Sequence, residues 1–453
     1  MCRTVRESSM ANGVRVGVKV EALYREIRAL RIYEGATRCR RSSSHAKYSK
    51  RANSESGRRL NRAVMILSEE QMRIRQMAQD FAQRHLLPYS AEWDRDRTFP
   101  HDALRQMGRL GFMGMTVPPE WDGAGADYVS YAIALEEIAA GDGAVSTIMS
   151  GHNSVGCMPL LQHGSAEQNE RFLRPMARGE MLSAFCLTEP HCGSDAAAIR
   201  TRAERRHGGY VLNGTKHFIT SGKNADVALV FAVTDSSKGK HGISCFIVET
   251  SRPGYQISRV ERKMGQNASD TCEIAFYELE IPLQSRLGAE GDGYHIALAN
   301  LEGGRIGIAA QAVGMARAAY DIALAYVQER KSFGKLIFEH QAVAFRLADM
   351  ATRLEAARQL VLHAAALRSE GLPCLKEASM AKLFATEVAE QICSDAMQTL
   401  GGAGYMTDFD VERIYRAVRA SKIYEGTNDI QRLVISRSLV DAEHQEQRLQ
   451  KCS

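Results

Sequence analysis

The chain contains 453 residues, of which 45% are apolar and 25% are charged, the balance of an ordinary globular protein. No apolar run is long enough to cross a bilayer, so we expect no transmembrane helix and no membrane insertion. Ten cysteines are scattered without C-x-x-C or Cys/His metal spacing, so we expect reduced thiols and no bound metal.

The net charge of +5 is unevenly distributed along the chain. Residues 1–64 hold 16 Lys and Arg against 5 Asp and Glu, a balance of +11, which leaves −6 for the remainder. The positive charge therefore belongs to one segment and does not indicate nucleic-acid binding. This Arg- and Ser-rich segment lacks the apolar stretch of a secretory signal. We interpret it as a disordered or non-native basic extension, with a mitochondrial transit peptide as the alternative. The corresponding locations are the bacterial cytoplasm and the mitochondrial matrix.

Residues 65–179 are expected to form an N-terminal helical domain. Ser68-Glu-Glu-Gln71 is a capping box, and apolar residues follow it at helical spacing until Pro88, where we expect an interruption. Further helices are predicted over 128–140 and 145–161. His152 and Asn153 could face a pocket, but structural roles are favoured.

Residues 180–290 are expected to form a β-barrel-like domain, because the apolar period changes to two. Strands are predicted over 227–233, 243–248, 255–260 and 272–279. A further strand is predicted to run from Tyr210 into an Asn-Gly turn at Gly214.

Two segments of this domain carry candidate binding groups. The loop Phe185–Asp195 offers N–H and O–H donors that suit a heteroaromatic ring or a phosphate, and an ordinary Ser/Asp turn is an equal alternative. The segment His217–Gly222 adds an aromatic face and a hydroxyl.

Residues 291–445 are expected to form a C-terminal four-helix-bundle domain, which completes an α+β multi-domain fold. Glu329–Lys335 ends one helix with cations and a hydroxyl, a plausible diphosphate clamp whose alternative is a solvated basic turn. In Gln398–Gly404, three glycines mark a turn where the backbone approaches another group closely.

Glu425 stands between Tyr424 and Gly426, just before a helix start at Thr427–Asp429. Taken alone, this stretch favours a capping or surface glutamate. A carboxylate aimed into a cleft by a turn that contains glycine is the alternative.

Five blocks together resemble the acyl-CoA dehydrogenase family over nearly all of residues 65–440. They occur in the family's order and are Cys186-Leu-Thr-Glu-Pro with Gly193-Ser-Asp195, Lys216-His-Phe-Ile-Thr220, Arg330-Lys-Ser-Phe-Gly334 with His340-Gln341, Gln398-Thr-Leu-Gly-Gly402, and Ile423-Tyr-Glu-Gly-Thr427. The resemblance implies this family's three-domain fold and a homotetramer that holds FAD between subunits. It also implies a role in fatty-acid β-oxidation or branched-chain amino-acid catabolism.

The resemblance assigns two groups of FAD-binding residues. The flavin end is lined by Phe185, Leu187, Thr188, Ser194, Phe218 and Thr220. In the family, a second group of residues holds the diphosphate and adenosine of an FAD that is bound to the neighbouring subunit. The residues that match this group are Arg330, Ser332, Phe333, His340, Gln341, Gln398, Gly401 and Gly402. Thr427 and Asp429 match the segment that closes over the cofactor, and substrate contacts are assigned to Ser194, Arg305 and Gly426.

Glu425 matches the family's catalytic base, which removes the α-proton of an acyl-CoA while the β-hydride passes to the flavin. Exclusion of water raises the pKa of a carboxylate and makes it a better base. In one branch of the family the base stands at the position of Gly304, which has no side chain here. Glu302 lies two residues earlier, points about 200° away on a helix, and is interpreted as structural.

The resemblance favours a short-chain or short-branched acyl-CoA, of the isobutyryl type, and transfer of electrons to an electron transfer flavoprotein. Asn267 supports the branched alternative, because the commoner family pattern has arginine there. An oxygen-using acyl-CoA oxidase and an inactive interaction protein of the same fold remain as alternatives.

Overall fold

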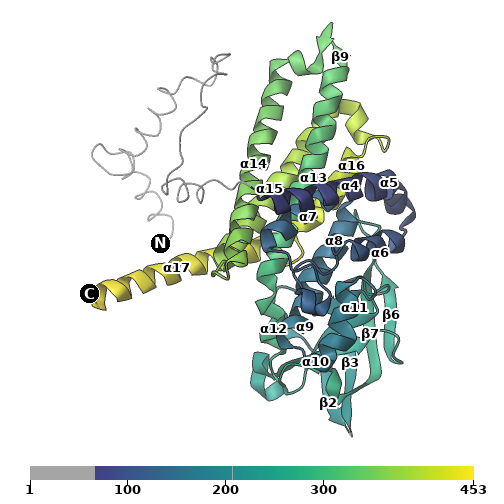
Figure 1. The fold of residues 1–453 in the computed structure, drawn as a ribbon, viewed down its shortest axis with the longest axis vertical. Helices are drawn as coiled ribbons and strands as arrows, with labels where there is room; N and C mark the ends of the chain where they lie inside the picture. The colour runs from purple at the N-terminus through teal and green to yellow at the C-terminus, as the bar shows by residue number, and fades with distance from the viewer. Residues whose placement is uncertain (1–66, 207, 453) are drawn as a thin grey trace, which may run out of the picture. The chain divides into compact units, whose positions relative to one another are not determined.

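A computed structural model describes residues 67–206 and 208–452 of the chain (Figure 1). The basic segment 1–64, with its two interpretations, therefore lies outside the described residues. Within them, a helical region, a β region and a second helical region follow one another, as the expected fold class requires. Among the described helices, none combines the length and apolar character needed to span a bilayer.

The first helical region is a series of short helices joined by π-helical and 3-10 turns. Its elements are α4 (Glu69–Phe81), η1 (Ala82–Leu86), α5 (Leu87–Asp96), α6 (His101–Arg109), η2 (Pro119–Trp121), α7 (Tyr128–Gly141), α8 (Gly143–Gly151), η3 (His152–Cys157), α9 (Met158–His163), α10 (Ala166–Gln168), η4 (Asn169–Leu173) and α11 (Arg174–Ala177).

The predicted interruption at Pro88 is wrong, since the chain stays helical from Glu69 to Asp96. The π-helical turn η1 precedes Pro88 and places it in the first turn of α5, where a missing N–H costs little. The expected capping box at Ser68 is confirmed. His152 and Asn153 are buried and hydrogen-bonded to backbone groups, which confirms their structural roles.

The β region is one eight-stranded sheet. Its strands are β1 (Ser183–Cys186), β2 (Arg202–Arg206), β3 (Gly209–Thr220), β4 (Val227–Val233), β5 (Ile243–Glu249), β6 (Tyr255–Val260), β7 (Thr271–Pro282) and β8 (Arg286–Leu287), with the 3-10 turns η5 (Ala196–Ala198), η6 (Ser236–Gly242) and η7 (Leu283–Ser285). The order is β6-β7-β3-β2-β4-β5-β8, and β1 pairs with β4 in parallel.

Side chains of β4 alternate between two cores. Val227, Leu229 and Phe231 pack with helices of the first region, whereas Ala228 and Val230 pack with residues of β3 and β7. The sheet therefore folds over an internal core, as expected of a barrel-like domain.

The Asn-Gly turn predicted at Gly214 is wrong, because β3 continues through it to Thr220. The pairing of β3 with β7 shifts register between Leu212 and Gly214, so the glycine marks an irregularity in the strand. A Cβ at Gly214 would lie 2.5 Å from Thr201 Oγ1, and this close approach explains why glycine is needed there.

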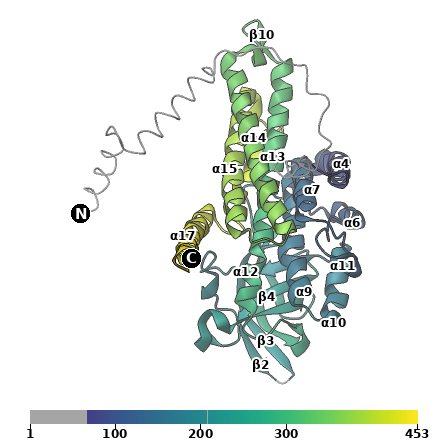
Figure 2. The same ribbon diagram turned by 60° about the vertical axis from the view of Figure 1, so that its left-hand side comes forward.

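The second helical region contains three long helices side by side, α13, α14 and α15 (Figure 2). Its elements are α12 (Gly293–Ala299), α13 (Leu301–Glu329), β9 (Lys331–Ser332), β10 (Lys335–Leu336), η8 (Ile337–Glu339), α14 (Gln341–Ser369), α15 (Leu375–Leu400), η9 (Gly401–Tyr405), α16 (Val411–Val418), η10 (Arg419–Lys422) and α17 (Asn428–Cys452). The short hairpin β9–β10 lies at the end of this bundle that points away from the sheet in both views.

Candidate active site

Glu425 lies in a short turn between η10 and α17. Its φ of 54° and the φ of 86° at Gly426 are both in the left-handed region, which is uncommon for a residue with a side chain. Thr427 Oγ1 accepts the N–H of Ile430 at 3.4 Å and so caps α17. The predicted helix start is therefore confirmed, and the turn aims Glu425 away from that helix.

The carboxyl group of Glu425 faces the start of α13. A Cβ at Gly304 would lie 2.7 Å from Glu425 Oε2, so the glycine leaves the space that the carboxylate occupies. This Oε2 atom is buried and has no hydrogen-bond partner among the described residues. Glu302 does not compete for this space, because it accepts a hydrogen bond from Arg368 Nη1 at 2.8 Å.

Burial raises the pKa of Glu425 to about 7, against the opposing influence of the Arg305 and Lys382 cations. A carboxylate with a pKa near neutrality is better suited to remove a weakly acidic proton than one in water. The N–H of Glu425 finds no acceptor in the described part of the chain, so it remains available as a donor.

Two buried cations lie within electrostatic range of this carboxylate. Arg305 Nη1 donates to Ser379 Oγ at 3.2 Å, and its Nε has no partner within the described residues. Lys382 on α15 donates from Nζ to the Gly426 carbonyl oxygen at 2.9 Å. Sequence reasoning missed Lys382, although it occupies the alanine-rich face of its helix between Ala378 and Ala385.

Tyr424, the neighbour of Glu425, anchors the turn to all three regions. Its hydroxyl donates to Gln311 Oε1 at 2.7 Å and accepts from Gln266 Nε2 at 3.2 Å. Gln311 belongs to α13, and Gln266 belongs to the loop between β6 and β7. Gln266 also accepts from Thr147 of α8 at 2.7 Å. The Gly265–Asn267 stretch therefore supports the turn that carries Glu425.

The residues assigned to the flavin end lie in and beside β1 and β3. The Thr188 carbonyl oxygen accepts the N–H of His217 at 2.9 Å, which brings the two segments together. Phe218 has a left-handed φ of 59°, and its side chain is 61% exposed. Phe185 and Leu187 instead pack partly against the apolar core, so at most part of their surface faces a ligand. Ser194 is exposed, and Thr220 ends β3 half-buried.

The residues assigned to the diphosphate and adenosine gather at the far end of the helical bundle. Phe333, at the tip of the β9–β10 hairpin, is 93% exposed, and His340 lies within hydrogen-bond distance of the Ser332 carbonyl oxygen. Arg346 Nη1 donates to Thr399 Oγ1 at 3.4 Å, which joins the start of α14 to the end of α15. Exposed residues of this group are Arg330, Ser332, Gln341, Gln398, Gly401 and Gly402.

One copy of the chain does not bring these two groups together, because the hairpin and the sheet lie at opposite ends (Figures 1 and 2). Both groups nevertheless suit FAD. Phe218 and Phe333 expose large aromatic faces, and nothing lies within 4 Å of a Cβ placed at Gly401 or Gly402. Such open glycine backbone allows close approach by a ligand.

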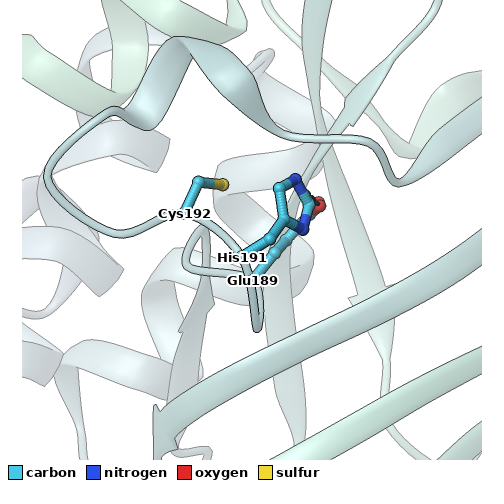
Figure 3. Close-up of side chains that lie close together, drawn as sticks. All are labelled: Glu189, His191 and Cys192. Atoms are coloured by element: carbon cyan, nitrogen blue, oxygen red, sulfur yellow. Dashed lines mark ion pairs between the residues drawn. The ribbon is translucent and has the colours of Figure 1, made fainter.

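Glu189, His191 and Cys192 form a compact cluster in the loop after β1, which Figure 3 shows. The carboxylate of Glu189 is fully engaged by Lys216 Nζ at 2.7 Å and by the N–H groups of Arg200 and Thr201. His191 Nε2 lies 3.0 Å from the Ala198 carbonyl oxygen. These contacts assign the cluster a role in holding the loop in place.

The Glu425 carboxylate has an Oε2 without a hydrogen-bonding partner in the described residues and two cations within electrostatic range, which is the arrangement of an enzyme site that handles a proton. Three family models cover most of the described chain. They are the N-terminal, middle and C-terminal domains of acyl-CoA dehydrogenase, and they match residues 68–180, 184–279 and 291–440.

Individual relatives agree with these models. An acyl-CoA dehydrogenase of Bacillus subtilis is 49% identical over 376 residues, which cover 83% of this chain and 99% of the relative. A short-chain specific acyl-CoA dehydrogenase of Clostridium acetobutylicum is 44% identical, with coverage of 82% and 98%. Subunit CarC of the caffeyl-CoA reductase-Etf complex of Acetobacterium woodii is 42% identical, with coverage of 83% of this chain and 100% of the relative.

The solved structure of butyryl-CoA dehydrogenase from Megasphaera elsdenii superimposes with a TM-score of 0.82 at 39% identity, covering 83% of this chain and all of the other. The chain belongs to the acyl-CoA dehydrogenase family. Members of this family are FAD-dependent oxidoreductases of fatty-acid β-oxidation, and a tetramer is typical of them.

Proposed function

We propose that this protein dehydrogenates a short-chain or short-branched acyl-CoA to the trans-2-enoyl-CoA, with Glu425 as the base that removes the α-proton. The observation that carries the proposal is the unpartnered, buried Oε2 of Glu425 over Gly304. A structural carboxylate at this depth would be hydrogen-bonded, as Glu189 is.

The residues of the chain have separate tasks in this reaction. Glu425 takes the α-proton at a carboxylate oxygen, and exclusion of water around it makes that transfer less costly. The free N–H of Glu425 can donate to the thioester oxygen, on which negative charge develops as the proton leaves. FAD, when bound, supplies the acceptor for the β-hydride. Arg305 and Lys382 keep the surroundings of the developing charge positive.

We place FAD between two copies of the chain. The flavin-lining residues and the diphosphate and adenosine residues lie at opposite ends of one copy, so one cofactor needs one end from each of two copies. A homotetramer, which is typical of the family, provides such pairs. Thr427 and Asp429 start α17 beside Glu425, in keeping with a segment that closes over the cofactor.

The substrate is proposed to carry a short acyl chain. The short-chain specific and butyryl-CoA relatives support this assignment. Tyr128 fills the space beside Gly303, the neighbour of Gly304 on α13, since a Cβ at Gly303 would lie 3.3 Å from its ring. Electrons are proposed to leave through an electron transfer flavoprotein, in line with the Etf-complex relative.

The test is optical and anaerobic. The purified protein is expected to be yellow, and butyryl-CoA or isobutyryl-CoA is expected to bleach the flavin band in stopped flow. Comparison of the two rates decides between straight and branched chains. Absence of bleaching with every short acyl-CoA would contradict the proposal and leave the inactive interaction protein as the better explanation.

Reoxidation separates dehydrogenase from oxidase. The bleached protein is mixed either with air-saturated buffer or with an electron transfer flavoprotein. We expect fast recovery of the flavin band only with the flavoprotein, and equally fast recovery in air would favour the oxidase.

A further inference from the structure

Lys382 is a fully buried lysine that reaches from α15 to the turn after Glu425. Its Nζ donates to the Gly426 carbonyl oxygen and to Asn428 Oδ1, both at 2.9 Å. A single ammonium group therefore holds two residues of the segment that carries the proposed base. This arrangement is stable only if something offsets the cost of burying the charge.

Each acceptor has a second possible donor within hydrogen-bonding distance. The Gly426 carbonyl oxygen also accepts from Gln431 Nε2 at 2.8 Å, and Asn428 Oδ1 also accepts from Thr386 Oγ1 at 3.2 Å. A neutral side chain at position 382 would leave the Gly426 oxygen with a donor, whereas the Thr386 hydroxyl also lies 2.8 Å from the Lys382 carbonyl oxygen and has one proton for the two acceptors. Hydrogen bonding to the Gly426 oxygen therefore does not by itself require a buried ammonium, and the charged groups around Lys382 give a second reason for one.

The groups that face Lys382 show what this charge acts on. From α13 comes Arg305, which is buried, while Glu302 of the same helix is paired with Arg368. From the turn comes Glu425. Glu425 is thus the one carboxylate in this group without an ion-pair partner within hydrogen-bonding distance.

Lys382 and Glu425 each influence the pKa of the other. Burial lowers the pKa of Lys382 to about 7, and the Glu425 carboxylate opposes that shift. Burial raises the pKa of Glu425, and Arg305 and Lys382 oppose that shift. Each group therefore favours the charged form of the other across a buried gap.

We propose that Lys382 is a positioning residue for Glu425: its ammonium group fixes the turn that carries the carboxylate and favours the ionised form of that carboxylate. The inference rests on the proposed role of Glu425 and extends it to a residue on another helix. Lys382 acts on the base without touching the substrate.

The kinetic test is the pH dependence of anaerobic flavin bleaching by butyryl-CoA or isobutyryl-CoA. Lys382→Met removes the charge and keeps the chain length, and Lys376→Met, at a half-buried position of the same helix where the lysine pairs with Glu377, is the matched control. Loss of the cation makes ionisation of Glu425 harder, so the acid limb of the rate profile should move up by about one pH unit. The rate should fall about tenfold at pH 6 and return toward the wild-type value at pH 9.

The controls separate charge from structure. Lys382→Arg keeps the charge, so its acid limb should stay at the wild-type position even where the overall rate is lower. A loss of rate in Lys382→Met that is equal at all pH values overturns the proposal, because it indicates a structural role only. Should Lys382→Met not fold, Lys382→Gln provides the same neutral test.

A readout independent of catalysis is the thermal unfolding of the FAD-loaded protein between pH 5 and 8. The unfolding temperature of Lys382→Met should fall more steeply with rising pH than that of the wild type. Adding Glu425→Gln should reduce that difference to the part that comes from the titration of Lys382 itself. Parallel curves in all variants overturn the coupling of Lys382 to Glu425. If none of the acyl-CoAs tested bleaches the flavin of the wild type, the proposed function fails. The unfolding comparison still tests whether Lys382 and Glu425 are coupled.

Discussion

Two glutamates with buried carboxylate oxygens and lysines nearby serve two different purposes. Glu189 accepts hydrogen bonds from Lys216 Nζ and from two backbone N–H groups, and the two side chains are fully buried together. Glu425 has an Oε2 without a partner in the described chain, although Lys382 is close enough to influence it.

The protonation behaviour of the two glutamates differs accordingly. The pKa of Glu189 lies below its ordinary value, because Lys216 and its hydrogen bonds outweigh the effect of burial. The pKa of Glu425 is raised to about 7, because burial outweighs the two cations. Hydrogen bonds to the charged form make a carboxylate structural, and their absence makes it available for chemistry.

The largest expected effect is on the rate of Glu425→Gln. Without a base, bleaching of the flavin by a short acyl-CoA should slow by about 10²- to 10⁴-fold. Stopped-flow absorbance measures the rate, and the flavin content of the variant is the control. Normal bleaching by this variant would remove Glu425 from the proposed role.

Glu189→Gln should act on stability. It leaves the Lys216 ammonium buried without a counter-charge, and we expect a loss of roughly 3 kcal/mol in the free energy of unfolding at pH 7. Because the pKa of Glu189 is lowered, its contribution is present above the ordinary pKa of a glutamate and is lost as the pH falls through the lowered value. Denaturant unfolding at pH 7 and at pH 3 to 4 checks both statements, and an unchanged midpoint at pH 7 would contradict them.

Glu425→Gln should change stability in the opposite direction. A raised carboxyl pKa means that ionisation costs folding free energy, and this cost grows between about pH 4.5 and pH 7. The variant should therefore exceed the wild type by about 3 kcal/mol at pH 8 and match it near pH 4.5. Thermal or denaturant unfolding at the two pH values measures the difference. A variant that is less stable than the wild type at pH 8 would show that the two glutamates do not differ as described.

The smallest expected effect belongs to Tyr424→Phe. The change removes the hydrogen bond to Gln311 Oε1 and should cost about 1 kcal/mol of stability. The rate of bleaching should fall a few-fold, since the turn that holds Glu425 in its left-handed conformation becomes less constrained. Val418→Ala, on the neighbouring helix α16, tests whether a comparable loss of stability alone slows the reaction; an equal slowing there would contradict a specific role for Tyr424.

Much of this fold can be predicted from the periodicity of apolar residues and from the residues that start and end helices and strands. Strands β4 and β6 have the predicted bounds, and Thr427 caps α17 where the hydroxyl, amide and carboxylate residues indicated a helix start. The two errors arise from tertiary effects on local signals. Pro88 is tolerated because a π-helical turn precedes it, and Asn213-Gly214 remains in a strand because Thr201 packs against the glycine.

The candidate site was predictable only in part. Glu425 could be singled out because the family pattern marks it, and Gly304 lies opposite its carboxylate. Lys382, Gln311 and Gln266 were not predicted, because a lysine or glutamine in a helix or loop has no local signature for what it meets in the fold. Their roles depend on contacts between residues 44 to 158 positions apart in sequence.

The separation of the hairpin end from the sheet end has a genetic consequence. In the proposed cofactor site, each of two copies of the chain contributes one end. A chain altered at Phe333, or one altered at Thr188, therefore has a defect in every cofactor site when it is expressed alone. In a mixed assembly, some sites combine both defects and others combine two intact ends. Two inactive alleles of this gene should then complement each other when they are expressed together, and two alleles altered at the same end should not.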